Sequence, residues 1–344
     1  MQERTRIKSR RRPTAPTRTS CKRANECESD AMKRWTVLVT ALPLAVASCG
    51  AGDSGGSTIT VRVERPPFDA DRAFQDLERQ VAFGPRIPGS AGHARQLEWL
   101  ETELRALADT VFLDPFEHVT REGDELALTN VIARFGPADG SRLLLLTHWD
   151  TRPKADQSPE AADREEPVLG ANDGASGTAV LLELARMFNE QPPSGGVEFL
   201  FSDGEDYGPS TEDMFLGARH YVAGIGSENP PAFGILLDMV ADADPSFPVE
   251  AYSMEGAAQV VQRVWGIAAD MGYRRFFPMD RTVRVIDDHV QFNEAGIPVA
   301  DIIDFDYGSG NSFWHTPRDV VGNTSAQTLL MVGEVVAEVV YRNR

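Results

Sequence analysis

Apolar and polar residues alternate along residues 70–342 in patterns that predict helices and strands in turn. The stretch 73–107 carries two helical patterns, with apolar residues three and four positions apart, on either side of a Gly- and Pro-rich turn. Further helices are predicted over 174–189, 214–222, 257–271 and 325–341, and strands over 126–135, 142–147, 197–201, 233–240 and 299–305. This alternation predicts an α/β fold, a three-layer αβα domain with a central mixed, mostly parallel sheet, over residues 61–344.

The first 60 residues predict export. From Met32, two basic residues precede an apolar run too short to span a bilayer comfortably, then small residues and Cys49. The run Val46 to Cys49 resembles the lipobox of bacterial lipoproteins, so we expect a signal peptide over 32–48, acylation of Cys49, a flexible tether over 49–60 and attachment to the outer face of a bacterial membrane. An ordinary secretory signal is the alternative. Because a complete signal starts at Met32, we interpret residues 1–31 as an upstream extension.

Charge is distributed unevenly along the chain. Residues 1–34 hold 11 Lys and Arg against 4 Asp and Glu, which leaves 23 basic and 48 acidic residues, a formal charge of −25, in the remainder. Such an acidic body argues against nucleic acid as a partner and against a basic membrane-binding face. The three cysteines, Cys21, Cys27 and Cys49, all precede the predicted domain. A metal ion in that domain must therefore be held by oxygen and nitrogen.

Polar residues with metal-binding side chains follow the predicted strands. His148 and Asp150 come after one strand, Glu205 and Asp206 after another, Asp238 ends a third, and His315 lies in the loop after a fourth. Open α/β sheets bind ligands at the carboxyl ends of their strands. Imidazoles and carboxylates without cysteine suit a catalytic zinc ion. Each candidate taken singly has a structural alternative, and Asp173 in GANDGASG could merely cap the following helix.

A set of motifs in fixed order resembles a known family. The segments FGPRIPGSAGH, THWDTRP, VLGANDGASGTAVLLELAR, FLFSDGEDYG, VIDDHVQFNEAGIPV and FWHTPRD together resemble the zinc-dependent glutaminyl cyclases and the zinc aminopeptidases of the same clan. The resemblance covers roughly residues 70–342. It implies the zinc aminopeptidase-like fold, a zinc cofactor and peptide or protein N-termini as substrates.

The resemblance also implies a role for individual residues. Asp173, Asp206 and His315 match the ligands of one zinc ion, although the animal cyclases and many of the peptidases have Glu where this chain has Asp206. Glu205 matches the proton-transfer carboxylate. The remaining matches are an acidic pair that lines the pocket, Asp238 and Asp287, and an aromatic wall, Trp314.

Two reactions are compatible with these residues. In a glutaminyl-peptide cyclotransferase, the α-amine of an N-terminal glutamine attacks its own γ-carbonyl, pyroglutamate forms and ammonia leaves, with Glu205 as acid and base. In an aminopeptidase, His148 and Asp238 complete a second zinc site and Glu205 activates water. Trp314 before the metal histidine and Asp287 before Asp288-His289 favour the cyclase. A third hypothesis is an inactive, lipid-anchored module that binds peptides.

Overall fold

A computed structural model describes residues 64–137, 140–225 and 230–343. The predicted signal peptide, Cys49 and the tether lie outside the described residues. The described residues belong to one compact unit of the chain. Within this part of the chain, no helix has the length and apolar character needed to cross a membrane.

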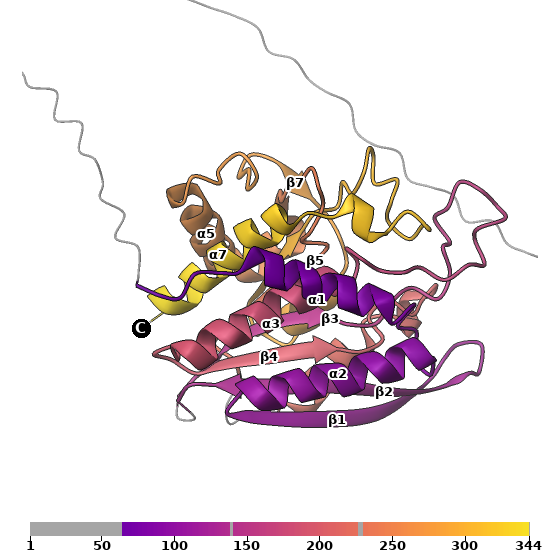
Figure 1. Cartoon of the computed structure of the whole chain (residues 1–344), viewed down its shortest axis with the longest axis horizontal. Helices are drawn as coiled ribbons and strands as arrows, with labels where there is room; N and C mark the ends of the chain where they lie inside the picture. The colour runs from indigo at the N-terminus through magenta and orange to yellow at the C-terminus, as the bar shows by residue number, and fades with distance from the viewer. Residues whose placement is uncertain (1–63, 138–139, 226–229, 344) are drawn as a thin grey trace, which may run out of the picture. The chain divides into compact units, whose positions relative to one another are not determined.

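The centre of the domain is a six-stranded sheet in the order β1-β2-β4-β3-β5-β8 (Figure 1). The four strands β4, β3, β5 and β8 are parallel, whereas β1 and β2 run antiparallel to their neighbours. The prediction of a mixed, mostly parallel sheet is confirmed. The bounds are β1 (Thr110–Val119), β2 (Glu125–Phe135), β3 (Leu143–His148), β4 (Val197–Ser202), β5 (Phe233–Asp238) and β8 (Val299–Ile303), with a separate two-stranded sheet of β6 (Val249–Glu250) and β7 (Thr282–Val283).

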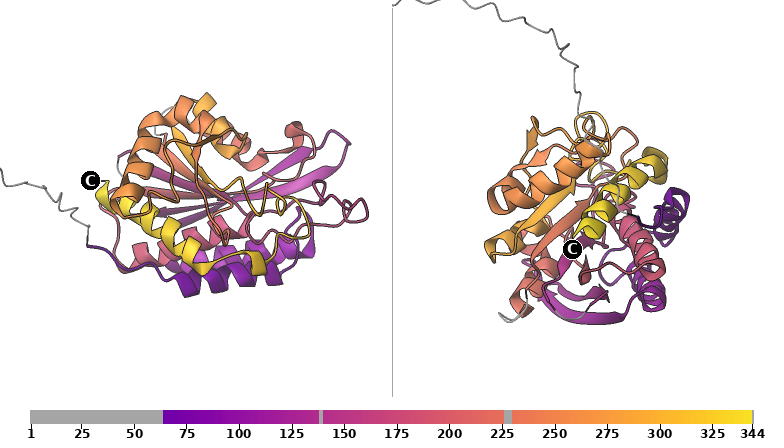
Figure 2. Two further views of the ribbon diagram at one scale, coloured as in Figure 1. Left: turned by 90° about the horizontal axis from the view of Figure 1, so that it is seen from above. Right: turned by 90° about the vertical axis from the view of Figure 1, so that its left-hand side faces the viewer.

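The strands β3, β4, β5 and β8 point their side chains into two cores on opposite faces of the sheet. Leu143 and Leu145 belong to the larger core, whereas Leu144 and Leu146 belong to the smaller one. This follows from the two-residue period of a strand that is buried on both faces. Helices α1 (Ala70–Ala82), α2 (Ala91–Leu107), α3 (Ala175–Glu190), α5 (Ala251–Asp270) and α7 (Ala326–Arg342) contribute to the larger core. Helices α4 (Leu216–Gly224) and α6 (Asp288–Glu294) contribute to the smaller one (Figure 2).

Helix α5 (Ala251–Asp270) begins six residues before the predicted helix. The side chain of Glu250 caps its first turn by accepting hydrogen bonds from the backbone N–H groups of Tyr252 and Ser253. Ala257 has non-helical dihedral angles, φ −137° and ψ 35°, and interrupts the helix at the predicted start. The apolar period therefore identified only the regular part of α5 beyond this kink.

Besides the two-residue strands β6 and β7, a strand of the main sheet and a short helix were not predicted. Strand β1 lies at the edge of the sheet, has no fully buried residue and contains Pro115, so it lacks the apolar pattern of an inner strand. Helix α6 has seven residues, which is too short to establish a helical period. Its N-cap residue is Asp287, one of the residues predicted to line the pocket.

Close packing of α3 against the sheet leads to a stability prediction. A Cβ atom on Gly177 would lie 2.1 Å from the Thr147 hydroxyl and 2.4 Å from the Leu237 carbonyl oxygen. We expect Gly177→Ala to lower the free energy of unfolding by about 1–3 kcal/mol, because the backbone of β5 must shift. Urea unfolding measures the change. Gly266→Ala in α5 is the matched control: with nothing within 4 Å, it should stabilise by about 0.5–1 kcal/mol. Equal effects of the two variants would contradict the packing argument.

Candidate metal centre

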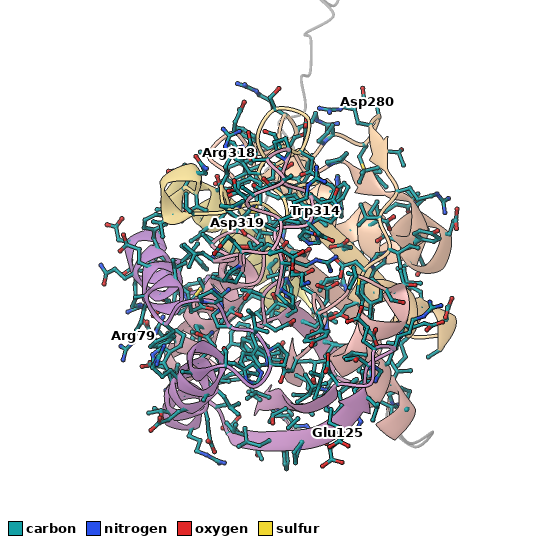
Figure 3. The ribbon with its side chains drawn as sticks, turned by 90° about the vertical axis from the view of Figure 1, so that its right-hand side faces the viewer. Arg79, Glu125, Asp280, Trp314, Arg318 and Asp319 are labelled. Carbon is teal, nitrogen blue, oxygen red and sulfur yellow. The ribbon has the colours of Figure 1, made fainter. Side chains whose placement is uncertain are left out.

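The candidate residues gather at the carboxyl ends of the parallel strands. His148 ends β3, Asp238 ends β5, and Glu205 and Asp206 follow β4 within four residues. Figure 3 views the domain from the right-hand side of Figure 1 and labels Trp314 among the loops of this side. The structure thus places these side chains at one edge of the sheet.

The structure brings Asp173, Asp206 and His315 together in one buried group, which we call the Asp206 cluster. His315 Nε2 lies 3.0 Å from an Asp206 oxygen and 3.5 Å from Oδ2 of Asp173. His315 has a left-handed backbone, φ 51°, which is uncommon for a residue other than glycine and is typical of functional sites. Its ring stacks on Trp314, with centroids 3.8 Å apart, so the predicted aromatic wall lies beside the imidazole.

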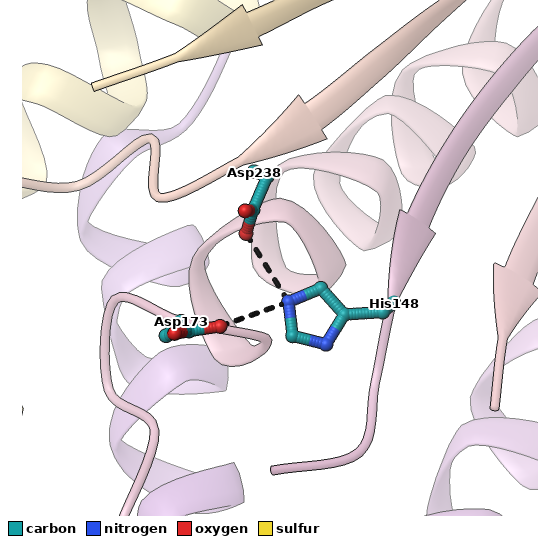
Figure 4. A group of neighbouring side chains, drawn as sticks. All are labelled: His148, Asp173 and Asp238. Atoms are coloured by element: carbon teal, nitrogen blue, oxygen red, sulfur yellow. Dashed lines mark hydrogen bonds and ion pairs between the residues drawn. The ribbon is translucent and has the colours of Figure 1, made fainter. Parts of the chain in front are cut away.

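A second group shares Asp173 with the first. His148, Asp173 and Asp238 form the His148 cluster, in which His148 Nε2 lies 3.1 Å from both Oδ1 of Asp173 and Oδ1 of Asp238 (Figure 4). Asp173 therefore presents one oxygen to His148 and the other to His315. This is the arrangement of a carboxylate that can bridge two metal ions.

The donor atoms of the Asp206 cluster fit a zinc ion. Bonds of about 2.0–2.1 Å in a tetrahedron place two donors about 3.3 Å apart, close to the 3.0 and 3.5 Å found around His315 Nε2. The other oxygen of Asp206 is buried and has no hydrogen-bond partner. Burial lowers the pKa of His315, but the charge of Asp206 and the nearby carboxylates of Asp156 and Asp173 outweigh it and raise the pKa to about 9. The negative charge of these carboxylates favours a cation at this position.

Glu205 lies beside both clusters. Its carboxylate is buried, and one oxygen is 3.8 Å from His148 Nδ1. Burial raises the pKa of Glu205 well above its ordinary value, and the charges of Asp287 and Asp206 add to this while His148 opposes it. A carboxylate in such surroundings can hold a proton near neutral pH, as a general acid and base requires.

The acidic pair predicted from the motifs lies next to Glu205. Asp238 and Asp287 are both buried. Burial, then the charge of Asp238, raises the pKa of Asp287 well above its ordinary value. One oxygen of Asp287 accepts the backbone N–H of Asp288, and the other has no hydrogen-bond partner. This free oxygen can interact with a ligand.

Two aspartates for which the sequence predicted no specific role fix the loops of the site. Asp150 accepts the backbone N–H groups of Glu205 and Asp206, each at 3.1 Å. Asp319 accepts that of Asp173 at 3.1 Å and the hydroxyl of Tyr307 at 2.9 Å. Such contacts orient metal ligands. Asp319 stands in the same FWHTPRD motif as His315, which was a signal that it belongs to the site.

Arg152 and Asp156 form a further supporting pair. Arg152 donates to an oxygen of Asp206 at 3.3 Å and to Asp156 at 2.8 Å, and Asp156 lies 3.5 Å from His315 Nδ1. The same two residues line a cavity of about 510 Å³, together with Thr120, Tyr207 and Asp213.

Arg86 is a fully buried cation between two of the loops. Its guanidinium group donates to the carbonyl oxygens of Leu169, Gly170 and Trp149, so it links the segment before Asp173 to the segment after β3. Burial lowers its pKa to about 10, against the charges of Asp319, Asp150 and Asp173, which raise it. No local sequence pattern indicated this role.

We expect Arg86→Met to weaken zinc binding by about 10–100-fold, because the loop that carries Asp173 loses its anchor. Arg86→Lys should also weaken binding, since an ammonium group cannot reproduce the planar fork. Competition with a zinc chelator measures both. Arg65→Met, which breaks ion pairs with Glu334 and Glu338 on α7, is the control and should leave zinc affinity unchanged. Tighter zinc binding by Arg86→Met would show that Arg86 acts only by repelling the ion.

One further aspartate and one histidine of the same region, Asp203 and His220, have structural roles. Asp203 lies 2.9 Å from His93 Nε2 and accepts the backbone N–H of Thr129. His220 is partly exposed, stacks on Phe116 and pairs with Asp114. Neither Asp203 nor His220 belongs to a metal-binding group among the described residues.

The peptidase family M28 model matches residues 130–340 of this chain. A glutaminyl-peptide cyclotransferase-like protein of Mus musculus is 28% identical over 283 residues, which cover 73% of this chain and 70% of the relative. The crystal structure of Bacteroides thetaiotaomicron glutaminyl cyclase bound to N-acetylhistamine is 35% identical, with a TM-score of 0.78, and the match covers 82% of this chain and 100% of that one. Aminopeptidase YwaD of Bacillus subtilis is 30% identical over 178 residues, 50% of this chain and 37% of that protein.

Proposed function

Because the chain belongs to peptidase family M28, we propose that it is a zinc-dependent glutaminyl-peptide cyclotransferase. It converts the N-terminal glutamine of peptides to pyroglutamate and releases ammonia. The observation that carries the proposal is the buried acidic set Glu205, Asp238 and Asp287 beside the Asp206 cluster. Likeness to a glutaminyl cyclase along the whole length of that enzyme supports it.

Asp173, Asp206 and His315 would hold the zinc ion. When bound, zinc supplies Lewis-acid polarisation of the substrate's γ-carbonyl group. Trp314, stacked on His315, gives the pocket an apolar wall against which the glutamine side chain can lie.

Glu205 moves the proton. The α-amine attacks the γ-carbon and loses a proton to the Glu205 carboxylate, and the same proton then passes to the departing amide nitrogen, which leaves as ammonia. One C–N bond forms, one breaks, and Glu205 ends the cycle ionised. Its raised pKa brings the proton affinities of donor and acceptor closer together.

Asp287 orients the substrate. Its unpartnered oxygen can accept a hydrogen bond from the α-amine before the attack. Burial, with the charge of Asp238 added to it, keeps the pKa of Asp287 high, so this pair shares negative charge instead of carrying two full charges. The pair therefore suits the neutral or singly charged α-amine of the substrate.

Zinc aminopeptidase activity is the second candidate. The intact His148 cluster favours it, because Asp173 presents separate oxygens to His148 and His315. In that reaction Glu205 would take a proton from water, and the product would be a free N-terminal amino acid. An inactive module that binds peptides is the third candidate, distinguished by absence of turnover in zinc-loaded protein.

Mass spectrometry of the products tests the first proposal. A peptide with N-terminal glutamine should lose one ammonia and keep its full length. Release of free glutamine with a shortened peptide would contradict cyclisation and support the aminopeptidase. A peptide that begins with alanine is the control and should remain intact.

Export and acylation of Cys49 form a separate proposal. It is supported by the basic start at Met32, the short apolar run and the small residues before Cys49. We propose that the enzyme is attached by lipid to the outer face of a bacterial membrane. Labelling with a radioactive fatty acid should mark the wild-type protein but not Cys49→Ser.

A further inference from the structure

A third group of donor atoms lies behind Asp287. Asp287, His289 and Asp301, which we call the His289 cluster, present donor atoms within 4.8 Å of one another. Asp287 and His289 come from the start of α6, and Asp301 comes from β8. His289 and Asp301 have no exposed surface, and Asp287 is 3% exposed. The group is separate from His148, Asp206 and His315.

Four donor atoms of this cluster have no hydrogen-bond partner. They are Nδ1 of His289, both side-chain oxygens of Asp301 and Oδ2 of Asp287. A buried polar atom without a partner costs free energy comparable to a lost hydrogen bond. His289 Nδ1 lies 3.7 Å from Oδ2 of Asp301, a few tenths of an ångström more than the spacing of about 3.3 Å between donors on one zinc ion.

The other nitrogen of His289 is held by a carboxylate. Nε2 lies 2.9 Å from Glu250 Oε2, and Glu250 also accepts the backbone N–H groups of Tyr252, Ser253 and Val285. Burial raises the pKa of Glu250, but His289 and these N–H groups lower it to about 2. A histidine that binds metal usually donates its second nitrogen to such a carboxylate. Glu250 thus fixes the ring with Nδ1 directed toward Asp301.

The cluster also has excess negative charge. Burial raises the pKa of Asp301 well above its ordinary value, and Asp287, Asp238, Glu250 and Asp288 each raise it further. A buried group of this kind needs either protons or a cation to neutralise it.

We propose that Asp287, His289 and Asp301 form a further site for a divalent cation of the zinc type. Two carboxylate oxygens and one imidazole nitrogen are the donors that zinc prefers when cysteine is absent. A cation at this site binds the Asp287 oxygen that has no hydrogen-bond partner, so this oxygen is no longer available to the substrate amine. Zinc bound at this site in excess therefore inhibits turnover, a consequence that rests on the proposed cyclotransferase function.

Anomalous diffraction at the zinc edge tests the site directly. Wild-type crystals soaked in zinc chloride should show a peak about 2 Å from His289 Nδ1, besides the peak at the Asp206 cluster. Asp301→Asn should lose only the first peak. Asp304→Asn is the matched control, because Asp304 is a buried carboxylate three residues further on that accepts backbone N–H groups instead, and it should keep both peaks.

A wild-type crystal with zinc at the Asp206 cluster and none at His289 would overturn the site, whether or not the variants fold. Inhibition by excess zinc tests its consequence: its midpoint should rise at least about tenfold in Asp301→Asn and stay unchanged in Asp304→Asn. An equal midpoint in Asp301→Asn and wild type would overturn the inhibitory role. A peak at His289 in a protein that forms no pyroglutamate would support the site and refute the proposed function alone.

Discussion

Replacing Glu205 by glutamine is expected to lower turnover of a glutaminyl peptide by about 10²- to 10⁴-fold while the protein keeps its zinc. Glutamine has the size of glutamate but cannot accept the amine proton. Glu205 lies outside the three residues of the Asp206 cluster, so the metal ligands are unchanged. Steady-state ammonia release and zinc content, measured on the same sample, check both parts.

Glu212→Gln is the matched control for this variant. Glu212 lies in the same loop as Glu205, but its side chain is 70% exposed and pairs only loosely, at 3.8 Å, with Arg121. It should retain full turnover. Turnover of Glu205→Gln within about twofold of the wild type would remove Glu205 from the proton-transfer role, because such a role contributes at least about 10²-fold.

Asp206→Ala is expected to weaken zinc binding by more than about 100-fold, since even residues that only orient a ligand contribute about 10–100-fold. The variant loses an oxygen that lies 3.0 Å from His315 Nε2 and leaves Arg152 without that acceptor. A chelator competition titration measures the affinity. Turnover at a fixed zinc concentration should fall in parallel with the bound zinc.

Asp203→Asn tests whether Asp206, and not the neighbouring Asp203, is the metal ligand. Asp203 is buried three residues before Asp206, and its contacts go to His93 and Thr129. The variant should lose stability but bind zinc with unchanged affinity. If Asp206→Ala kept its zinc and Asp203→Asn lost it, Asp203 would be the metal ligand and Asp206 the structural carboxylate.

Periodicity predicted every inner strand and long helix of the domain because these elements bury regular apolar faces. The strand Leu143–His148 is buried at each position, and α7 presents a continuous apolar stripe. The edge strand β1 was not predicted because none of its residues is fully buried, so it lacks a regular apolar face. The candidate residues were predicted from their place after strands, and the fold brought His148, Asp173, Asp206, Asp238 and His315 together as two linked groups.

Residues that act through tertiary contacts could not be predicted in this way. Arg86 stands 83 residues before Leu169, whose carbonyl group it anchors, and the turn in which it lies gives no sign of this partner. Asp319 contacts the backbone N–H of Asp173 across 146 residues. The pairing of His289 with Glu250 depends on how α6 packs on the start of α5. Local sequence patterns contain no information about contacts between residues so far apart in the chain.

Metal-free protein titrated with zinc, and assayed in parallel on a glutaminyl dipeptide and a leucyl amide, tests the proposed chemistry most directly. We predict cyclisation of the glutaminyl dipeptide with ammonia release that reaches its maximum near one equivalent of zinc, and no release of leucine. Release of leucine that keeps rising until two equivalents are bound, with no pyroglutamate formed, would contradict the cyclotransferase and establish the aminopeptidase.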